Sequence, residues 1–243
     1  MISSLNDLRI VPLERLILHE AHDPSRLARL CERMEAEGVQ RNPVIVSPHG
    51  EDYLVLDGAH RIQALRGLGC KLALVQMTEP PEAAESWGHV LEEDRLSGID
   101  TIEEVEVSGK GRWLARVESG EGDELFLRAR GEGLAAEVEA LWGLQPMYPE
   151  GVVHRVDSEA PVRLEAGEAV IRYRPFTPRE LVEVVGLGKV LPAGITRFRV
   201  SERVLGVRFP LEKLRDGEPE ERGAELEALV RRLWDENRIR YYG

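Results

Sequence analysis

A β-rich run gives way to a helical pattern within one short stretch of this chain, Leu54-Val55-Leu56-Asp57-Gly58-Ala59-His60-Arg61. The three apolar residues before Asp57 favour a strand, and the apolar residues after Arg61 recur at helical spacing. The recurring residues are Ile62, Leu65 and Leu68, and Gly67 and Gly69 end the pattern. Asp57-Gly58 therefore stands at a strand-to-helix junction, as expected in an α/β protein.

More strands and a helix are predicted on the N-terminal side of this junction. Residues 43–46 and 53–56 are β-rich, and the segment His49-Gly50-Glu51-Asp52 between them suits a hairpin turn. A helix is predicted between a cap at Asp23 and a stop at Gly38. The other predicted elements are a short strand with a turn over residues 8–18 and a strand over residues 72–77.

The character of the sequence changes near residue 95. Residues 98–133 are rich in Gly and charge with short apolar runs, which predicts a twisted antiparallel sheet. Other expected features are a helix over residues 82–92, helices over 134–141 and 225–237, a strand over 169–173, a helix start at Thr177 and a solvated loop at 218–221. We therefore predict two domains, residues 1–95 and residues 96–243, the second of the α+β class.

The composition is that of an ordinary globular protein. Hydrophobic residues make up 42% of the 243 residues and charged residues 31%, which excludes collagenous, low-complexity and disulfide-scaffold classes. The formal net charge is −12. A nucleic-acid-binding protein usually carries a basic face, so this balance disfavours DNA or RNA as a partner and is compatible with an enzyme acting on small metabolites.

The same sequence predicts a reduced, cytoplasmic protein that is not anchored in a membrane. Its two cysteines, Cys31 and Cys70, lack metal-ligand spacing. No apolar stretch approaches the length of a membrane span, and residues 1–7 have neither a basic cluster nor an apolar core.

The strand-to-helix junction is a candidate phosphate site. A helix N-terminus exposes unpaired N–H groups and a partial positive charge, and a glycine such as Gly58 lets a phosphate approach closely. His60 and Arg61 add donors, and Asp57 could hold a metal ion or the attacking hydroxyl. By itself, however, Asp-Gly at the end of a strand is also a common turn, and His60 could serve only to cap or pack.

Several segments together resemble one family. Residues 54–61, with 63–70 after them, are similar to the signature of the ParB/sulfiredoxin superfamily, and in particular of its free L-serine kinases. The further segments that agree are Leu18-His19-Glu20, Pro24-Ser25-Arg26, residues 42–46, Trp87, residues 191–197, Phe209-Pro210-Leu211 and Arg240-Tyr241-Tyr242. The resemblance covers both halves of the chain and is weak between residues 96 and 175.

The resemblance implies an activity in serine metabolism and cysteine biosynthesis. It is the transfer of a phosphoryl group from ADP or ATP, with Mg²⁺, to the hydroxyl of free L-serine, and it takes place in a nucleotide cleft formed with the second domain. Glu20 matches the family's catalytic glutamate, and Asp57 matches its second essential acid, beside the phosphates, where it could hold the magnesium ion.

The remaining roles follow from the same resemblance. The phosphate-binding turn matches Gly58, Ala59, His60 and Arg61, and a position near the nucleotide matches Asn42. Trp87 matches the aromatic residue of the serine pocket, although one Trp on an amphipathic helix usually belongs to a core. Thr196 matches a threonine that holds the polar groups of the substrate.

One position departs from the family pattern. The family reads Thr-Arg-His where this chain reads Thr196-Arg197-Phe198, so that a ring replaces a polar group on the substrate side. The acceptor could then be L-serine or a related small hydroxy compound.

Three other functions can be compared with this one. Ala59 occupies the position of the catalytic cysteine in sulfiredoxins, so no thiolate is present for that reaction. A chromosome-partitioning ParB would show an Arg-rich turn and a helix-turn-helix domain, neither of which is evident. The remaining alternative is a ParB-like regulator without kinase activity that senses a nucleotide or metabolite and could bind DNA. Retention of both Glu20 and Asp57 favours catalysis over this alternative.

Overall fold

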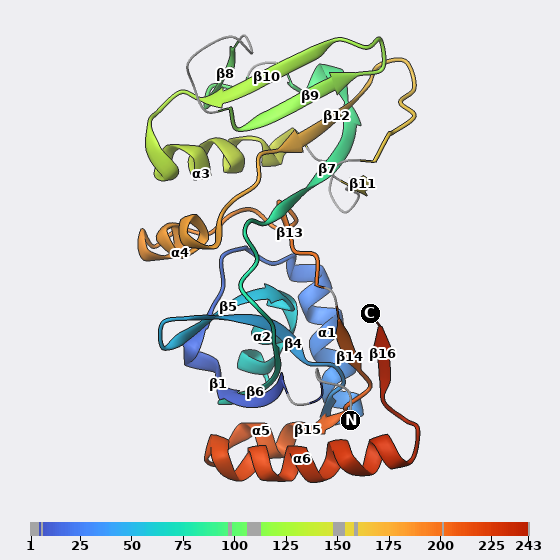
Figure 1. Cartoon of the computed structure of the whole chain (residues 1–243). Coiled ribbons are helices and arrows are strands. Elements are labelled where there is room, and N and C mark those ends of the chain that lie inside the picture. Colours follow the sequence, from blue (N-terminus) through green and yellow to red (C-terminus); the bar gives the residue numbers. More distant parts are fainter. Residues whose placement is uncertain are drawn as a thin grey trace. The chain divides into compact units, whose positions relative to one another are not determined.

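The computed structural model describes residues 5, 7–96, 99–105, 113–147, 154–157, 160–200 and 202–242 (Figure 1). The chain forms two compact units. Unit 1 combines Met1–Pro81 with Phe198–Gly243, and unit 2 is Glu82–Arg197. The predicted boundary at residues 95 and 96 therefore needs correction, because the strands on both sides of it belong to one sheet of unit 2 and the chain returns to unit 1 at Phe198.

Unit 1 is built on a five-stranded mixed sheet with the order β1-β6-β4-β5-β2. Its strands are β1 (Leu8–Pro12), β2 (Leu16–Ile17), β4 (Val44–His49), β5 (Asp52–Asp57) and β6 (Leu72–Met77). A 3-10 turn, Leu13–Arg15, joins β1 to β2. The predicted hairpin is confirmed, since β4 and β5 pair in antiparallel fashion. In contrast, β2 pairs with β5 and β4 with β6 in parallel. The carboxyl ends of β2 and β5 therefore lie at one edge of the sheet, and those of β4 and β6 lie at the opposite edge.

Helices α1 (Pro24–Glu37) and α2 (Ala59–Gly67) begin and end where the sequence predicts. The Asp23 side chain accepts a hydrogen bond from the backbone N–H of Arg26 at 2.9 Å, which caps α1. Gly38 ends α1 in the left-handed conformation with φ +67°, as glycine commonly does after a helix. Ile62, Ala64 and Leu65 of α2 are fully buried and join the core of unit 1.

The C-terminal residues complete unit 1. Strand β14 (Arg203–Leu205) pairs with β16 (Arg240–Tyr242), and β15 (Phe209–Pro210) pairs with β3 (Val39–Gln40). Helices α5 (Leu211–Arg215) and α6 (Pro219–Asp235) follow, and α6 lies along β1 (Figure 1). The loop predicted at residues 218–221 is instead the beginning of α6, where Glu220 and Glu221 interact favourably with the helix dipole.

Unit 2 contains a seven-stranded sheet with the order β11-β7-β12-β9-β10-β8, in which β13 also pairs with β7. The strands are β7 (Glu85–Glu92), β8 (Ile102–Val105), β9 (Ala115–Ser119), β10 (Glu124–Ala129), β11 (His154–Asp157), β12 (Glu168–Tyr173) and β13 (Thr196–Arg197). The helices are α3 (Gly133–Gly143) and α4 (Pro178–Gly186), with 3-10 turns at Glu93–Leu96 and Gln145–Met147. The predicted antiparallel sheet is confirmed for β8, β9 and β10.

The helix predicted around Trp87 is wrong, because these residues form strand β7. Strand β7 pairs with β11, β12 and β13, so its hydrogen bonds are made with other strands. Gly88 suits this pairing, since a Cβ at this position would lie 2.8 Å from Cγ2 of Val156 on the neighbouring strand. Long-range pairing has overridden the local helical pattern.

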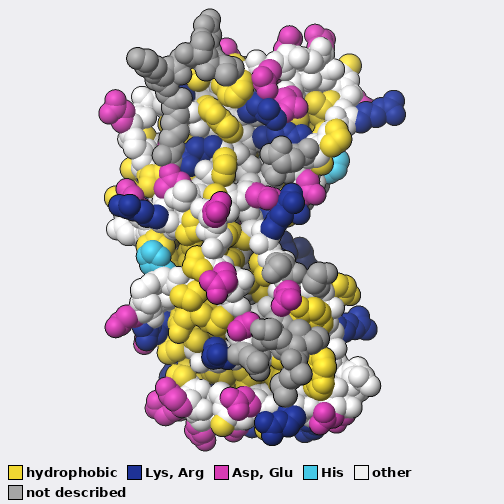
Figure 2. Space-filling model, in the orientation of Figure 1, with side chains coloured by type: hydrophobic (Ala, Val, Ile, Leu, Met, Phe, Trp, Pro, Cys, Tyr) yellow, Lys and Arg dark blue, Asp and Glu magenta, His cyan; other side chains and the backbone are white. Residues whose placement is uncertain are grey.

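The described surface carries both signs of charge. In Figure 2 the acidic and basic side chains are interspersed, without a continuous basic area on the face that is drawn. Among the described helices, none combines the length and the apolar character needed to cross a membrane.

Candidate functional site

The two predicted catalytic carboxylates follow neighbouring parallel strands. In the pairing of β2 with β5, Ile17 lies opposite Leu54. Glu20 and Asp57 each come three residues after these partners, so both stand at the carboxyl end of the same strand pair. In α/β sheets this edge is where ligands bind. The fold of unit 1 therefore brings together two acids that are far apart in the sequence.

Asp57 is held by two arginines. Its Oδ2 atom accepts a hydrogen bond from Arg61 Nη2 at 3.1 Å and another from Arg203 Nη1 at 2.5 Å. Burial by itself raises the pKa of this carboxyl group, but the two guanidinium charges outweigh that effect and the pKa is lowered. Asp57 is therefore ionised at neutral pH.

Arg61 connects the α2 N-terminus to the chain before β4. Its Nη1 atom donates to the carbonyl oxygens of Pro43 and Asn42, the latter at 3.4 Å. Burial lowers the pKa of the guanidinium, and the carboxylate of Asp57 opposes that shift. The guanidinium is thus fixed from two sides.

The backbone conformation at position 58 requires glycine. It precedes α2 with φ +116°, a region that residues with a side chain rarely adopt. A Cβ at this position would also lie 3.0 Å from Nε and Nη2 of Arg61. The first N–H groups of α2, at Ala59 and the next residues, have no partner within the helix and can bind an anion.

His60, which is predicted to bind phosphate, makes a structural contact with the N-terminus of α1. Its Nε2 atom accepts a hydrogen bond from the backbone N–H of Asp23 at 3.1 Å. A neutral ring that accepts at Nε2 carries its proton on Nδ1, so Nδ1 is the atom that could donate to a phosphate. The ring also lies edge-on to His22, with 6.4 Å between the ring centres.

Asn42 joins the site to the C-terminal segment. Its Oδ1 atom accepts a hydrogen bond from the backbone N–H of Gly206 at 2.9 Å. Asn42 and Arg61 also line a cavity of about 230 Å³, whose other walls come from α1 and residues 39–41. Two predicted nucleotide-binding residues therefore share one hollow.

Phe198 packs beside the residue that precedes Glu20. Its ring meets the ring of His19 edge-on, with 5.7 Å between the centres, and both side chains are buried. Burial lowers the pKa of His19 to about 4, so this imidazole is neutral at physiological pH. The ring that replaces the family's histidine thus contacts a neutral partner next to a predicted catalytic residue.

The two other predicted substrate residues lie together in unit 2. Thr196 of β13 pairs with Ser86, the neighbour of Trp87 in β7. The guanidinium of Arg197 lies 4.5 Å above the centre of the Trp87 ring and forms an ion pair with Asp157. One face of Trp87 is therefore covered by a cation.

The residues around Asp57 do not form a protein-held magnesium site. Within the described ranges there is no group of three or more His, Cys, Asp or Glu side chains suited to a metal ion. The Oδ2 atom of Asp57 is already engaged by two cations. Magnesium in proteins usually keeps several waters and binds substrate phosphates with one or two carboxylates. A site of that kind needs the phosphates of a bound nucleotide, and the assignment of Asp57 as a magnesium ligand stays a prediction.

Arg203 contacts the predicted site residue Asp57, and Gln76 holds the backbone around Arg203, although the sequence interpretation named neither residue. Gln76 is buried, and its side-chain amide bonds the backbone on both sides of Arg203, at Glu202 and Val204. Neither residue belongs to a motif, and Arg203 is one of many arginines in the chain. Because both residues act through contacts with segments distant in the sequence, no local sequence pattern identifies them.

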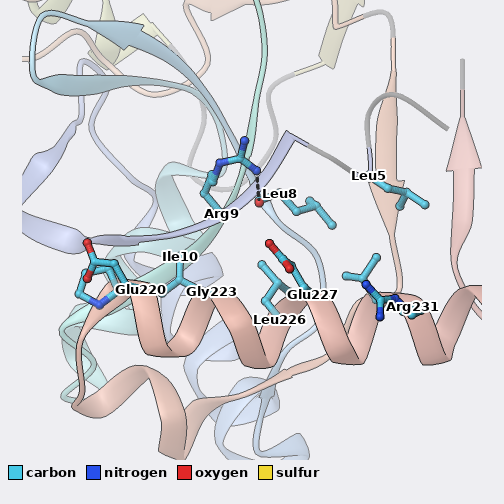
Figure 3. Close-up of a pocket in the computed structure, with 11 residues that line it drawn as sticks. Leu5, Leu8, Arg9, Ile10, Glu220, Gly223, Leu226, Glu227 and Arg231 are labelled. Carbon is cyan, nitrogen blue, oxygen red and sulfur yellow. Dashed lines mark hydrogen bonds between the residues drawn. The ribbon is translucent and has the colours of Figure 1, made fainter. Parts of the chain in front are cut away.

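A larger hollow in unit 1 lies away from these residues. This groove has a volume of about 550 Å³ and separates β1 from α6 (Figure 3). Its apolar lining includes Leu8, Ile10, Leu226 and Val230, and none of the predicted site residues contributes to it. The groove is therefore a feature of the core edge rather than a part of the candidate site.

Comparison with solved structures defines the class of fold. The structure of SbnI from Staphylococcus aureus, with a C-terminal truncation, has a TM-score of 0.81 and 26% identity, covering 97% of this chain and 99% of that one. A free serine kinase in complex with AMP has a TM-score of 0.63 and 20% identity, covering 86% and 93%. SbnI therefore shares the architecture of this chain, and the predicted mixed α/β class is confirmed.

Sequence comparison adds two curated relatives, although no protein-family model matches the chain. The ATP-dependent L-serine kinase SbnI of Staphylococcus aureus is 28% identical over 222 residues, which are 86% of this chain and 84% of that protein. An ATP-dependent L-serine kinase of Staphylothermus marinus is 25% identical over 229 residues, 85% and 90% of the two chains. The resemblance to free serine kinases is thereby confirmed.

Proposed function

We propose that this chain is a kinase that transfers the terminal phosphoryl group of ATP to the hydroxyl of free L-serine, giving O-phospho-L-serine and ADP. The observation that carries the proposal is the position of Glu20 and Asp57 at the carboxyl ends of paired parallel strands, beside the N-terminus of α2. Both curated relatives are named ATP-dependent L-serine kinases and match most of this chain, which favours ATP over ADP as the donor.

Glu20 is the proposed base. In the transfer, the serine oxygen bonds to the terminal phosphorus while the bond from that phosphorus to the bridging oxygen breaks, and ADP leaves. The hydroxyl proton passes to the Glu20 carboxylate and then to solvent. A weak nucleophile such as a hydroxyl gains from a positioned carboxylate in this way.

The turn from Gly58 to Arg61 is the proposed phosphate-binding element. Gly58 leaves the α2 N-terminus open, and Ala59, His60 and Arg61 contribute backbone N–H groups. The Arg61 guanidinium adds a fixed positive charge. Asn42 lines the same hollow as Arg61 and is proposed to lie near the nucleotide. Such preorganised donors stabilise the charge that develops on the transferred group.

Three residues are proposed to select the acceptor. The resemblance assigns Trp87 and Thr196 to the serine side, and Phe198 stands where the family has a polar side chain. A magnesium ion is proposed to arrive with the triphosphate of ATP, where it would neutralise phosphate charge. No step assigned to this chain's residues passes through the ion.

The test is direct product analysis. The purified protein is incubated with magnesium, L-serine and either ATP or ADP, and O-phosphoserine is measured by mass spectrometry together with the nucleotide product. We expect O-phosphoserine and ADP from ATP. Parallel reactions with L-threonine and L-homoserine test the effect of Phe198 on the acceptor. ATP binding without a phosphorylated product from any of these acceptors would overturn the proposal in favour of a nucleotide-sensing protein.

A further inference from the structure

Two guanidinium groups from distant parts of the chain converge on one carboxylate. Arg61 reaches Asp57 from the first turn of α2, and Arg203 reaches the same Oδ2 atom from β14. The three side chains carry a net charge of +1 when Asp57 is ionised. This surplus positive charge lies beside the N-terminus of α2, the end of a helix that attracts anions.

Asp57 is the group that allows the two cations to lie close together. The charge of Arg203 lowers the pKa of Arg61, so the two guanidiniums repel each other, and the charge of Asp57 acts in the opposite direction. An arginine paired with a carboxylate in this way still has donors that point elsewhere, because a guanidinium has five N–H bonds in a fixed plane.

Arg203 is also fixed through its own backbone. Gln76, at the end of β6, donates from Nε2 to the carbonyl of Glu202 at 2.9 Å. Its Oε1 atom accepts from the N–H of Val204, also at 2.9 Å. Gln76 is only 2% exposed, so β14 is held by buried hydrogen bonds directly on both sides of Arg203. A cation held in advance loses little conformational freedom when it binds a ligand.

We propose that Arg203 binds the phosphates of the nucleotide together with Arg61, and that Asp57 is a positioning residue that orients the two guanidiniums rather than a ligand of magnesium. This inference rests on the proposed function, since it deepens the description of the same phosphate site. It adds to that site a residue from the C-terminal segment, more than a hundred positions after the turn from Gly58 to Arg61.

The first experiment measures binding by isothermal titration calorimetry with the full chain. ATP and adenosine are titrated into the wild type, Arg203→Gln and the control Arg208→Gln. Arg208 is an exposed arginine of the same segment whose ion pair, with Glu37 at 3.8 Å, lies outside the triad. We expect Arg203→Gln to weaken ATP binding by about 10- to 100-fold, the usual effect of one charge-assisted hydrogen bond, and to change adenosine binding by less than about twofold.

Two results would overturn the role of Arg203. One is an ATP affinity of Arg203→Gln equal to that of Arg208→Gln. The other is an equal loss for ATP and adenosine, which would mean that the substitution only loosens β14. Because the titration needs no acceptor, it does not depend on serine being the substrate, whereas product analysis of the wild type tests the kinase activity itself.

A second experiment distinguishes the two alternative roles of Asp57, that of a positioning residue and that of a magnesium ligand. Asp57→Asn is made in the wild type and in Arg203→Gln, and ATP binding is measured over a range of magnesium concentrations. If Asp57 positions the arginines, the effect of Asp57→Asn is smaller in the Arg203→Gln background, and the magnesium concentration for half-maximal binding is unchanged. The positioning role would be overturned if Asp57→Asn had the same effect on ATP binding in both backgrounds and raised the magnesium concentration for half-maximal binding. Asp57 would then be a metal ligand.

Discussion

The side-chain oxygen of Asn42 accepts a hydrogen bond from the backbone N–H of Gly206 at 2.9 Å, although 164 positions separate the two residues. Together with the pairing of β15 with β3, this bond holds the C-terminal segment against the chain that leads into β4. The same asparagine lines the hollow beside Arg61. Its side chain therefore links the stability of unit 1 to the candidate phosphate site.

Two substitutions of Asn42 separate its effect on the stability of unit 1 from its effect on ATP binding. Asn42→Ala removes the acceptor and leaves the N–H of Gly206 without this partner, so we expect a loss of about 1–2 kcal/mol in the free energy of unfolding. Asn42→Asp keeps an acceptor at this position, and we expect it to retain more of that stability. The added negative charge beside Arg61 should nevertheless weaken ATP binding. Urea unfolding and calorimetry measure the two effects, and equal stability of Asn42→Ala and the wild type would contradict the structural role.

Glu20→Gln tests the proposed base. The amide retains the size of the side chain but cannot take up the hydroxyl proton, so we expect kcat for O-phosphoserine formation to fall by about 10²- to 10⁴-fold. ATP binding should remain close to that of the wild type, because no phosphate contact is removed. Glu14→Gln, at an exposed position in the preceding 3-10 turn, is the matched control. An equal loss of ATP affinity in Glu20→Gln would assign this residue to the nucleotide instead.

Gly58→Ala tests the close approach at the α2 N-terminus. The new Cβ would lie 3.0 Å from Arg61 Nε in a backbone region that alanine rarely adopts, so we expect lower stability and weaker ATP binding. Gly50→Ala is the control, because Gly50 also has positive φ, +60°, but has no atom within 4 Å of such a Cβ. Both variants should lose stability through backbone strain, and only Gly58→Ala should lose ATP affinity. Unchanged binding in Gly58→Ala would argue against a phosphate at this turn.

The buried histidines predict sensitivity to acid. Burial lowers the pKa of both His19 and His89 from 6.5 to about 4. Between these values the unfolded chain binds more protons than the folded one, so the free energy of unfolding falls as the pH is lowered from 6.5 towards 4. Each histidine could contribute up to about 3 kcal/mol to this loss.

The measurement for this prediction is unfolding by urea at pH 7 and at pH 5. Replacing His19 by Gln should reduce the loss of stability between these two values, because one of the two groups that gain a proton on unfolding is removed. His89→Gln should act in the same way on unit 2. If neither variant alters the loss of unfolding free energy between pH 7 and pH 5, these imidazoles are not the cause of that loss. The carboxyl of Asp57 adds a separate loss only at lower pH, since its pKa lies below the ordinary value.

The local parts of the fold and site could be predicted from the sequence. The cap at Asp23, the stop at Gly38 and the turn at Gly50 each depend on residues next to one another, so their patterns are visible in the chain. The junction at Asp57-Gly58 is of the same kind, and the resemblance then pointed to Glu20. The structure confirms each of these elements and places both acids after paired strands.

The remaining features depend on contacts between distant segments. Trp87 lies in a strand because three other strands pair with β7, and no local pattern contains that information. Arg203 contacts Asp57 only because the chain returns to unit 1 after residue 197. The predicted roles of Trp87 and Thr196, and the predicted cleft for the nucleotide, stay predictions.

The order of the units along the chain bears on synthesis at the ribosome. Unit 2 is one continuous stretch, whereas unit 1 needs residues on both sides of it. A nascent chain can therefore fold unit 2 before it can complete unit 1. Arg203 emerges only after unit 2, so a polypeptide still in elongation has Arg61 and Asp57 without their third partner. On this view, a chain whose translation stops early lacks the complete triad of charges at the candidate phosphate site.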